Sequence, residues 1–177
     1  MILVVAATER ELAGADGAAV LACGIGPVEA AVATARALAE RRPSRLLHVG
    51  IAGARGVAAP QLVIGSEAVY EDAAGGALVP GRARPDAALL AAARRALPDA
   101  HVLPIGTSAR VGGTTGCAIE AMEGFAVLRA AELAGVPAVE VRAVSNAIDE
   151  PDRSRWRFDD ALAALRAALP RLLAELQ

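Results

Sequence analysis

The amino-acid sequence predicts an α/β fold in a single domain, residues 1–177, with a central mixed, largely parallel twisted sheet flanked by helices. A chain of 177 residues is long enough for one domain with a sizeable core. Hydrophobic residues make up 55% of the chain and charged residues 21%, which is typical of a globular protein. Short apolar runs alternate along the chain with segments of helical period, and this alternation indicates an α/β sheet.

Apolar runs bounded by glycine, proline or charged residues define the expected strands. In chain order they are Ile2 to Ala6, Ala18 to Ala22, Arg45 to Val49, Leu62 to Tyr70, His101 to Ile105 (which Ser108 to Val111 extends or follows) and Ala138 to Val144. Gly65 interrupts the fourth of these strands, which predicts a bulge or bend at that position.

The segments between these strands carry helical spacing and ordinary helix boundaries. The expected helices are Val28 to Arg41, Asp86 to Leu97, Ile119 to Ala134 and Asp159 to Leu176. Pro27 suits the first turn of the first helix, Pro98 stops the second, and Gly135 closes the third.

Composition excludes several classes of function. The net charge of −2 gives no general attraction for nucleic acid or an anionic membrane, and no apolar stretch is long enough to span a bilayer. All 18 basic side chains are arginines, which excludes a Schiff-base lysine and a Walker-type phosphate loop. Cys23 and Cys117 lack metal-ligand spacing, so we expect free thiols in the cytoplasm, no metal and no cofactor.

Polar residues follow several expected strands at their carboxyl ends, where α/β folds bind ligands. Glu11 follows the first strand, and Ser145 and Asn146 follow the strand that ends at Val144. Glu123 can reach the same crevice from its expected helix. Taken alone, the two glutamates also fit solvated carboxylates that complement a helix dipole, and the Ser-Asn pair also fits a turn or a helix cap.

Three other features have ordinary structural explanations. Arg142 stands in an otherwise apolar strand and therefore needs a carboxylate or another polar partner. His48 also stands in an apolar strand and fits a hydrogen-bonded core residue better than a ligand. Gly24-Ile25-Gly26 follows a strand and opens a helix, but Glu29 occupies the third glycine position of a dinucleotide fingerprint. A tight turn explains this motif at least as well as ligand contact does.

The order of several short motifs carries a family resemblance. The motifs are ATEREL (7–12), CGIGPVEAA (23–31), HVGIAG (48–53), LVIGS (62–66), VYED (69–72), EAMEG (120–124) and VRAVSN (141–146). Over nearly the whole chain the sequence resembles the nucleosidase branch of the purine nucleoside phosphorylase superfamily, related to methylthioadenosine/S-adenosylhomocysteine nucleosidase. Within that branch the tail, with Ser145-Asn146, Asp152-Arg153 and Trp156, is similar to the futalosine hydrolases, which split hypoxanthine from futalosine in a menaquinone pathway.

The resemblance implies roles for the matching residues. Glu11 matches the glutamate that orients or activates the attacking water, Glu123 matches the acceptor of the sugar hydroxyls, and Asn146 matches the residue that faces the purine. The other matches support the pocket: Met122 beside the ribose, Ser145 behind the purine-facing residue, Arg142 as a structural or site-supporting arginine, and Ala52 and Gly53 as backbone near base and sugar. A small-molecule purine nucleoside is the implied ligand, and a homo-oligomer, dimer or larger, is the implied assembly.

The amide of Asn146 gives a physical reason to expect a 6-oxopurine. The adenine-specific nucleosidases have an aspartate at this position, which can donate to N7 and accept from the exocyclic amine. Hypoxanthine presents an acceptor, O6, instead. An amide donates its NH₂ to O6 while its carbonyl accepts from N7–H. The residue type therefore favours hypoxanthine over adenine.

Two departures from the family pattern concern the pocket. The segment 73–100 is shorter than in typical relatives, which affects the end of the pocket that binds the tail of the nucleoside. Residues 107–115 hold no aromatic ring where relatives often pack one against the base. Either Phe125 serves instead or stacking on the base is weak.

Other functions remain as alternatives. A 6-oxopurine nucleoside phosphorylase would share the fold, but Glu11 would place a negative charge where phosphate should bind. A methylthioadenosine/S-adenosylhomocysteine-type nucleosidase would have to bind adenine against the side-chain amide of Asn146. An inert purine-binding module is disfavoured by the intact set of Glu11, Glu123 and Asn146, although a fold alone never proves a function.

Overall fold

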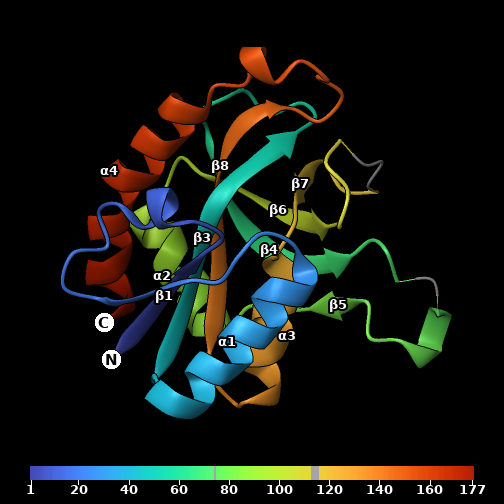
Figure 1. The fold of residues 1–177 in the computed structure, drawn as a ribbon. Coiled ribbons are helices and arrows are strands. Elements are labelled where there is room, and N and C mark those ends of the chain that lie inside the picture. The colour runs from blue at the N-terminus through green and yellow to red at the C-terminus, as the bar shows by residue number, and fades with distance from the viewer. Residues whose placement is uncertain (74, 113–115) are drawn as a thin grey trace.

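A computed structural model describes residues 1–73, 75–112 and 116–177. The strands are β1 Ile2–Ala6, β2 Ala19–Ala22, β3 Arg45–Ala54, β4 Leu62–Tyr70, β5 Arg82–Ala83, β6 His101–Thr107, β7 Ile119–Ala121 and β8 Ala138–Ala147. The α-helices are α1 Pro27–Arg41, α2 Ala87–Ala96, α3 Gly124–Leu133 and α4 Phe158–Leu176. Three short 3₁₀ helices are η1 Glu9–Leu12, η2 Gly76–Leu78 and η3 Arg153–Arg155. Figure 1 shows these elements in place.

The strands form one mixed sheet in the order β2-β1-β3-β7-β6-β4-β5, and β8 pairs with both β3 and β4. Five of the pairings are parallel: β1 with β2, β1 with β3, β3 with β8, β4 with β6, and β6 with β7. The pairs β3–β7, β4–β5 and β4–β8 are antiparallel. The prediction of a mixed, largely parallel sheet is confirmed. In addition, β3, β8, β4, β6 and β7 close into a ring.

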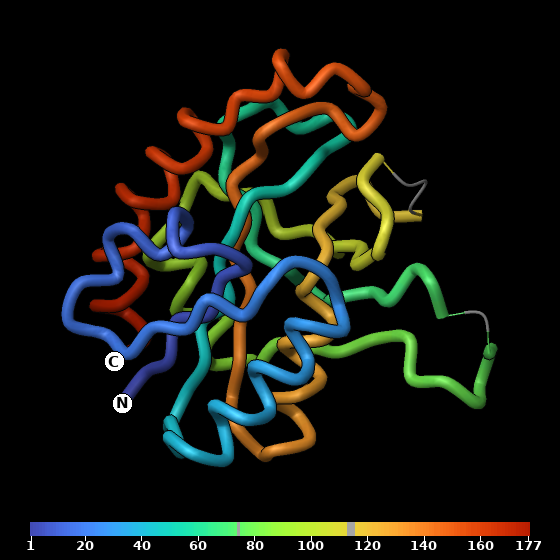
Figure 2. The backbone as a smooth tube through the Cα atoms, viewed as in Figure 1, coloured from blue at the N-terminus to red at the C-terminus, as the bar shows by residue number. Residues whose placement is uncertain are grey.

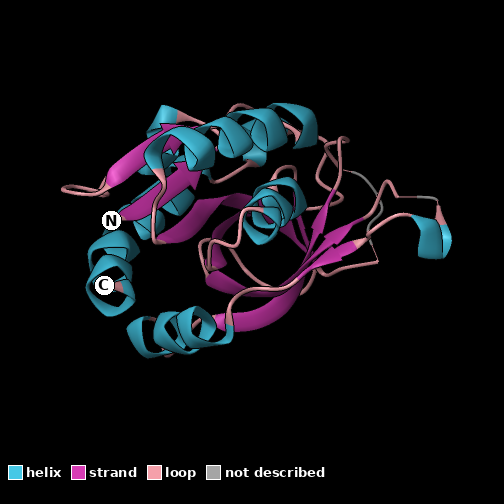
Figure 3. Cartoon of the chain, turned by 90° about the horizontal axis from the view of Figure 1, so that it is seen from below, coloured by secondary structure: helices cyan, strands magenta, loops and turns pink. Residues whose placement is uncertain are grey.

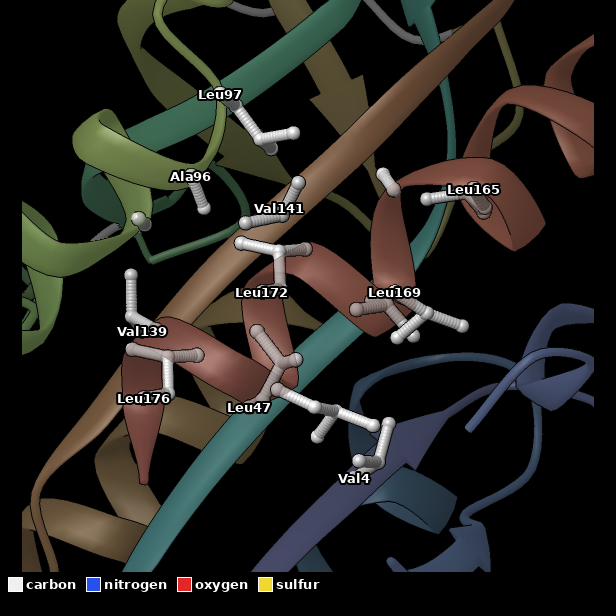
Figure 4. Packing of buried hydrophobic residues seen from close by; sticks show 14 of the residues in the cluster. Val4, Leu47, Ala96, Leu97, Val139, Val141, Leu165, Leu169, Leu172 and Leu176 are labelled. Atoms are coloured by element: carbon white, nitrogen blue, oxygen red, sulfur yellow. The ribbon is translucent and has the colours of Figure 1, made fainter. Parts of the chain in front are cut away.

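Helices cover the sheet on two sides. Helices α1 and α3 pack against each other on one side, and α2 and α4 pack together on the other (Figures 1 and 3). The period of two in each strand explains why both sides are apolar. On β8, Val139 and Val141 face the cluster under α4, together with Leu47 of β3 and with Leu169 and Leu172 of α4 (Figure 4).

The same alternation turns polar residues of the central strands to the opposite face. On β8 these are Glu140 and Arg142, and on β3 it is His48, which is in register with Glu140; Gly50 of β3, in register with Arg142, leaves room on the same face. All four are buried. The sequence therefore places a charged layer inside the fold, between the sheet and the start of α3.

The structure corrects some predicted elements. Ile119 to Ala134 is not one helix, because residues 119–121 form β7, which pairs with β3 and β6, and the helix begins at Gly124. Ser108 to Val111 does not extend the preceding strand, which ends at Thr107. The predicted bulge at Gly65 is confirmed, since the β4–β6 register shifts between Gly65 and Ala68.

The segment between β4 and β5 projects away from the body of the molecule, and η2 lies within it (Figure 2). Leu78 in this segment is almost fully exposed. In the described part of the chain, no helix combines the length and the apolarity needed to cross a membrane.

Candidate active site

A cavity of about 380 Å³ opens where β1, β3 and β8 end, next to the start of α3. All eight residues that the sequence singled out line this one cavity: Glu11, Ala52, Gly53, Met122, Glu123, Arg142, Ser145 and Asn146. They come from four separate stretches of the chain. The fold therefore brings the predicted site residues together, as the strand-end argument expects.

Glu11 is a buried carboxylate held by backbone donors. It lies in η1, and only 6% of its surface is exposed. Its Oε2 accepts from the backbone N–H and the hydroxyl of Thr8, at 2.9 and 2.8 Å, and its Oε1 accepts from the N–H of Ile51 at 3.0 Å. The exposed neighbour Glu9 is the solvated kind of carboxylate. Glu11 is thus fixed against the cavity with lone pairs left for a further ligand.

Glu123 occupies the residue before α3 and faces the same cavity from another side. Its Oε1 accepts from the backbone N–H of Gly26 at 3.1 Å. Its Oε2 lies 3.4 Å from both terminal nitrogens of Arg142. The Gly24–Gly26 turn therefore helps to position the site, because its backbone N–H at Gly26 orients the carboxylate of Glu123.

Arg142 is the buried cation of the site, with 1% of its surface exposed. Its Nε donates to Glu140 at 2.8 Å, its Nη1 donates to the carbonyl of Ile51 at 3.3 Å, and both terminal nitrogens reach Glu123. A Cβ atom at Gly50 would lie 2.2 Å from Nη1 of Arg142 and 3.0 Å from Oε1 of Glu11. Glycine at position 50 therefore permits the close approach of these two side chains. Arg142 therefore has two carboxylate partners, Glu140 and Glu123, where the sequence predicts at least one polar partner.

His48 completes this layer as a neutral residue. Its Nδ1 lies 3.0 Å from the carbonyl of Val5 and donates to it, so that Nε2 is free to accept from Nη2 of Arg142. Burial and the nearby Arg142 charge lower the pKa of His48 well below its usual value. His48 is the hydrogen-bonded core residue that the sequence predicts.

Asn146 and Ser145 lie at the end of β8. The hydroxyl of Ser145 lies 2.7 Å from Oδ1 of Asn146 and 3.2 Å from the carbonyl of Ala52. Nδ2 of Asn146 donates to the carbonyl of Ala147 at 2.9 Å. One N–H and one carbonyl lone pair of the amide are left over. This is the donor and acceptor pair that a 6-oxopurine edge needs.

The aromatic wall of the cavity differs from the expectation. Phe125 does not line it, because this ring stacks on Tyr70 at a centroid distance of 4.9 Å, under α1 and α3. Instead, Trp156 and Phe158 line the cavity, with ring centroids 5.3 Å apart. In the sequence, Trp156 stands out only as part of the tail motif, and Phe158, which begins α4, carries no signal that predicts its place at the cavity.

Several other expectations concern the surroundings of the cavity. In the described part of the segment 73–100, no residue lines the cavity; α2 packs on α4 instead. Of the ring-free stretch 107–115, Val111 and Gly112 line the wall, while residues 113–115 lie outside the described residues. Cys23 and Cys117 do not form a disulfide with each other. Within residues 1–73, 75–112 and 116–177, no group of histidine, cysteine and acidic side chains could hold a metal ion.

Comparison with known proteins finds relatives in sequence and in structure. The sequence pattern of the Phosphorylase superfamily matches residues 7–177. The futalosine hydrolase of Streptomyces coelicolor is 36% identical over 194 residues, covering 92% of this chain and 81% of that protein.

Two solved structures share the fold over almost their whole length. A futalosine hydrolase mutant of Helicobacter pylori strain 26695 superimposes with a TM-score of 0.84 at 17% identity, over 99% of this chain and 97% of that chain. The Streptococcus pneumoniae MTA/SAH nucleosidase in complex with 8-aminoadenine gives a TM-score of 0.85 at 23% identity, over 99% of this chain and 98% of that chain.

Proposed function

Because this chain belongs to the phosphorylase superfamily, we propose that its cavity hydrolyses the N-glycosidic bond of a 6-oxopurine nucleoside. The substrate we propose is futalosine, and the products are hypoxanthine and dehypoxanthine futalosine. As the resemblance to the futalosine hydrolases implies, this reaction would serve menaquinone biosynthesis. The observation that supports it best is the placement of Asn146 on one cavity with two buried carboxylates, Glu11 and Glu123.

The chemistry needs these residue types. As the C1′–N9 bond breaks, its electron pair leaves with the purine and positive charge builds on the ribosyl ring. Glu123, beside the sugar, accepts from its hydroxyls and stabilises that charge. Glu11 takes a proton from water as the water oxygen bonds to C1′, a role that contributes about 10²–10⁴-fold to the rate. The departing purine takes up one proton at N7 from solvent, and Glu11 returns to solvent the proton that it took from water, so the two proton transfers balance. Asn146 donates to O6 and accepts from that N7–H.

Water fits this site better than phosphate does. Glu11 and Glu123 both present carboxylates to the cavity, and the Arg142 guanidinium is held by Glu140 and Glu123. An incoming phosphate would be repelled by the negative charges of Glu11 and Glu123, whereas water would meet hydrogen-bond acceptors. This supports hydrolysis over phosphorolysis.

One assay tests the proposed function. The chain is incubated with futalosine, inosine and methylthioadenosine, each with and without phosphate, and free base is measured. We expect hypoxanthine from futalosine at a rate that phosphate does not change. Phosphate-dependent release would support the phosphorylase alternative, release of adenine alone would support the adenine nucleosidase, and no release from any substrate would support an inert purine-binding module.

We also propose a homo-oligomer located in the cytoplasm. Support comes from the outer surface of α1 and α3, where Val28, Val32 and Leu133 are 72%, 66% and 72% exposed. These side chains line a shallow apolar groove between the two helices, of the kind that a second copy can cover. Light scattering measures the mass of the assembly in solution for the native chain and for Val32→Glu. We expect the variant to form a smaller assembly than the native chain.

A further inference from the structure

The cation in the proposed active site is surrounded by three carboxyl groups. Arg142 contacts two carboxylates, Glu140 at 2.8 Å and Glu123 at 3.4 Å, and Glu11 approaches it across Gly50. His48 also contacts Arg142 but is neutral. With all three glutamates ionised, the layer carries one positive and three negative charges.

The positions of the three carboxylates differ in one respect. Glu11 and Glu123 line the cavity, whereas Glu140 is completely buried and is not among the residues that line it. Glu140 therefore has no route to the substrate. Its contact with the site runs through Nε of Arg142.

This arrangement has an electrostatic consequence. If Arg142 had only Glu123 as a partner, the guanidinium would cancel the carboxylate that has to face the ribosyl cation. We propose that Glu140 is a positioning residue whose charge offsets Arg142, so that the charge of Glu123 remains available to the transition state. This inference rests on the proposed function, because only a reaction that builds positive charge on the ribose needs such compensation.

The burial of Glu140 is unfavourable for the fold by itself. Within the described residues its Oε2 has no hydrogen-bond partner. A Cβ atom at Gly124 would lie 2.3 and 2.5 Å from the two carboxylate oxygens, so α3 begins with glycine pressed against this group. Burial raises the pKa of Glu140, and Arg142 acts in the opposite direction. A buried ion pair is often no more stabilising than a well-packed apolar pair, so stability alone does not explain the carboxylate.

Two of the surrounding groups hold Arg142 without adding charge. They are the neutral ring of His48 and the carbonyl of Ile51. Desolvation works against the guanidinium charge, but Glu140 and Glu123 together raise the pKa of Arg142. The cation is thus permanent, and the carboxylates around it set the net charge that the sugar meets.

The test compares a cationic and a neutral ligand of the same shape. The probes are a hydroxypyrrolidine that carries a 9-deazahypoxanthine group and is protonated at its ring nitrogen, and its cyclopentane analogue, which has no charge. The binding constants of both are measured by calorimetry with the native chain, Glu140→Gln, Glu140→Asp and the control Glu132→Gln. Glu132 is an exposed residue of α3 that pairs with Arg129.

We expect Glu140→Gln to lower the ratio of cationic to neutral affinity about tenfold, or 1.4 kcal/mol. Glutamine keeps an oxygen that accepts from Arg142 but has no charge. Glu140→Asp keeps the charge and should retain most of the ratio, and Glu132→Gln should leave it unchanged. Hydrolysis should follow the same order, with the loss in kcat and little change in KM.

The outcomes separate the inference from the proposed function. If the native chain binds neither probe, the proposed function is wrong. If the native chain prefers the cation and Glu140→Gln keeps that preference, the offsetting role of Glu140 is wrong while the proposed function stands. If Glu140→Gln weakens both probes equally, Glu140 only supports the shape of the site, and the inference is again overturned. A melting temperature for each variant shows whether it is folded.

Discussion

The hydroxyl of Ser145 lies 2.7 Å from Oδ1 of Asn146 on one side of the amide, and the carbonyl of Ala147 lies 2.9 Å from Nδ2 on the other. Because the Ala147 carbonyl can only accept, the NH₂ of Asn146 points toward Ala147 and its carbonyl points toward Ser145, which donates to it. The remaining N–H can then donate to O6 of a purine. The pair of residues at the end of β8 thus defines a donor and an acceptor at fixed positions.

We predict that Asn146 selects 6-oxopurines over 6-aminopurines. Against adenine, the NH₂ of Asn146 meets another donor, and a buried mismatch of this kind costs about 1–3 kcal/mol. Futalosine should therefore be preferred over its adenine analogue by roughly tenfold to a few hundredfold. Asn146→Asp should reduce hypoxanthine release and raise adenine release. The measurement is the ratio of kcat/KM for the two substrates, and a ratio that stays constant would show that Asn146 does not contact the base.

We predict that Ser145 acts through the orientation of Asn146. Ser145→Ala removes one of the two hydrogen bonds that orient the amide, so Asn146 turns over more readily and presents its NH₂ to N7. The loss of one hydrogen bond of about 1 kcal/mol corresponds to a drop of roughly fivefold in the preference for futalosine over the adenine analogue. Ser154→Ala is the control, because Ser154 bonds to Asp152 outside the cavity. Equal preference in the native chain and in Ser145→Ala would contradict this role.

Local sequence signals predicted most helices and strands. The errors occur where pairing with distant segments determines the secondary structure. Residues 119–121 carry a composition that fits a helix, but they form β7 because β3 and β6 provide backbone partners on both sides. The glycine- and alanine-rich end of β3 becomes a strand for the same reason, since β8 pairs along its length. Propensity is a weak guide when tertiary pairing overrides it.

The site shows the same contrast between local sequence signals and contacts that only the fold creates. Glu11, Glu123 and Asn146 were predicted to share one crevice because each follows a strand or begins a helix and matches a family motif, and all three line the cavity. Glu140 was missed, although a second charged residue two positions before Arg142 in a strand places both on one face. Phe125 was the wrong aromatic candidate, because its side chain packs toward Tyr70, which the sequence pattern does not reveal.

We predict that Glu11→Gln lowers turnover by about 10²-fold or more while hypoxanthine still binds. Glutamine is similar in size but cannot take a proton from water, and its NH₂ would face the N–H of Ile51 or Thr8. Glu9→Gln is a matched control, because Glu9 is an exposed residue of the same 3₁₀ helix. The measurements are kcat and the hypoxanthine dissociation constant. A variant at position 11 that turns over at the native rate would remove the water-activating role.

We predict that Glu123 binds the ribose hydroxyls. A hydrogen bond to a charged group contributes about 1.5–3 kcal/mol, so a 2′-deoxy substrate should lose roughly tenfold to a hundredfold in kcat/KM. Glu123→Ala should abolish most of that difference, because the acceptor is gone. Glu29→Ala, an exposed carboxylate of α1, should preserve it. If the native chain treats the ribo and deoxy substrates alike, this role of Glu123 is incorrect.

The last prediction concerns the pH dependence of stability and depends on His48. Burial and Arg142 lower the pKa of His48 well below its ordinary value of about 6.5, so the folded chain keeps the ring neutral while the unfolded chain protonates it. A lowered folded pKa gives stability that is present above pH 6.5 and is lost as the pH falls. Each pH unit below the unfolded pKa removes about 1.4 kcal/mol, and therefore the loss between pH 7.5 and 5.5 is about 1.4 kcal/mol.

The measurement is the free energy of unfolding in urea at pH 7.5, 6.5 and 5.5 (about one unit on each side of the unfolded pKa). His48→Gln cannot titrate but can still accept from Arg142, so its stability deficit relative to the native chain should shrink by about 1.4 kcal/mol over this range. Glu140 is present in both proteins, and its own titration cancels in the difference. A deficit of His48→Gln that stays constant over this range would mean that His48 can be protonated within the fold.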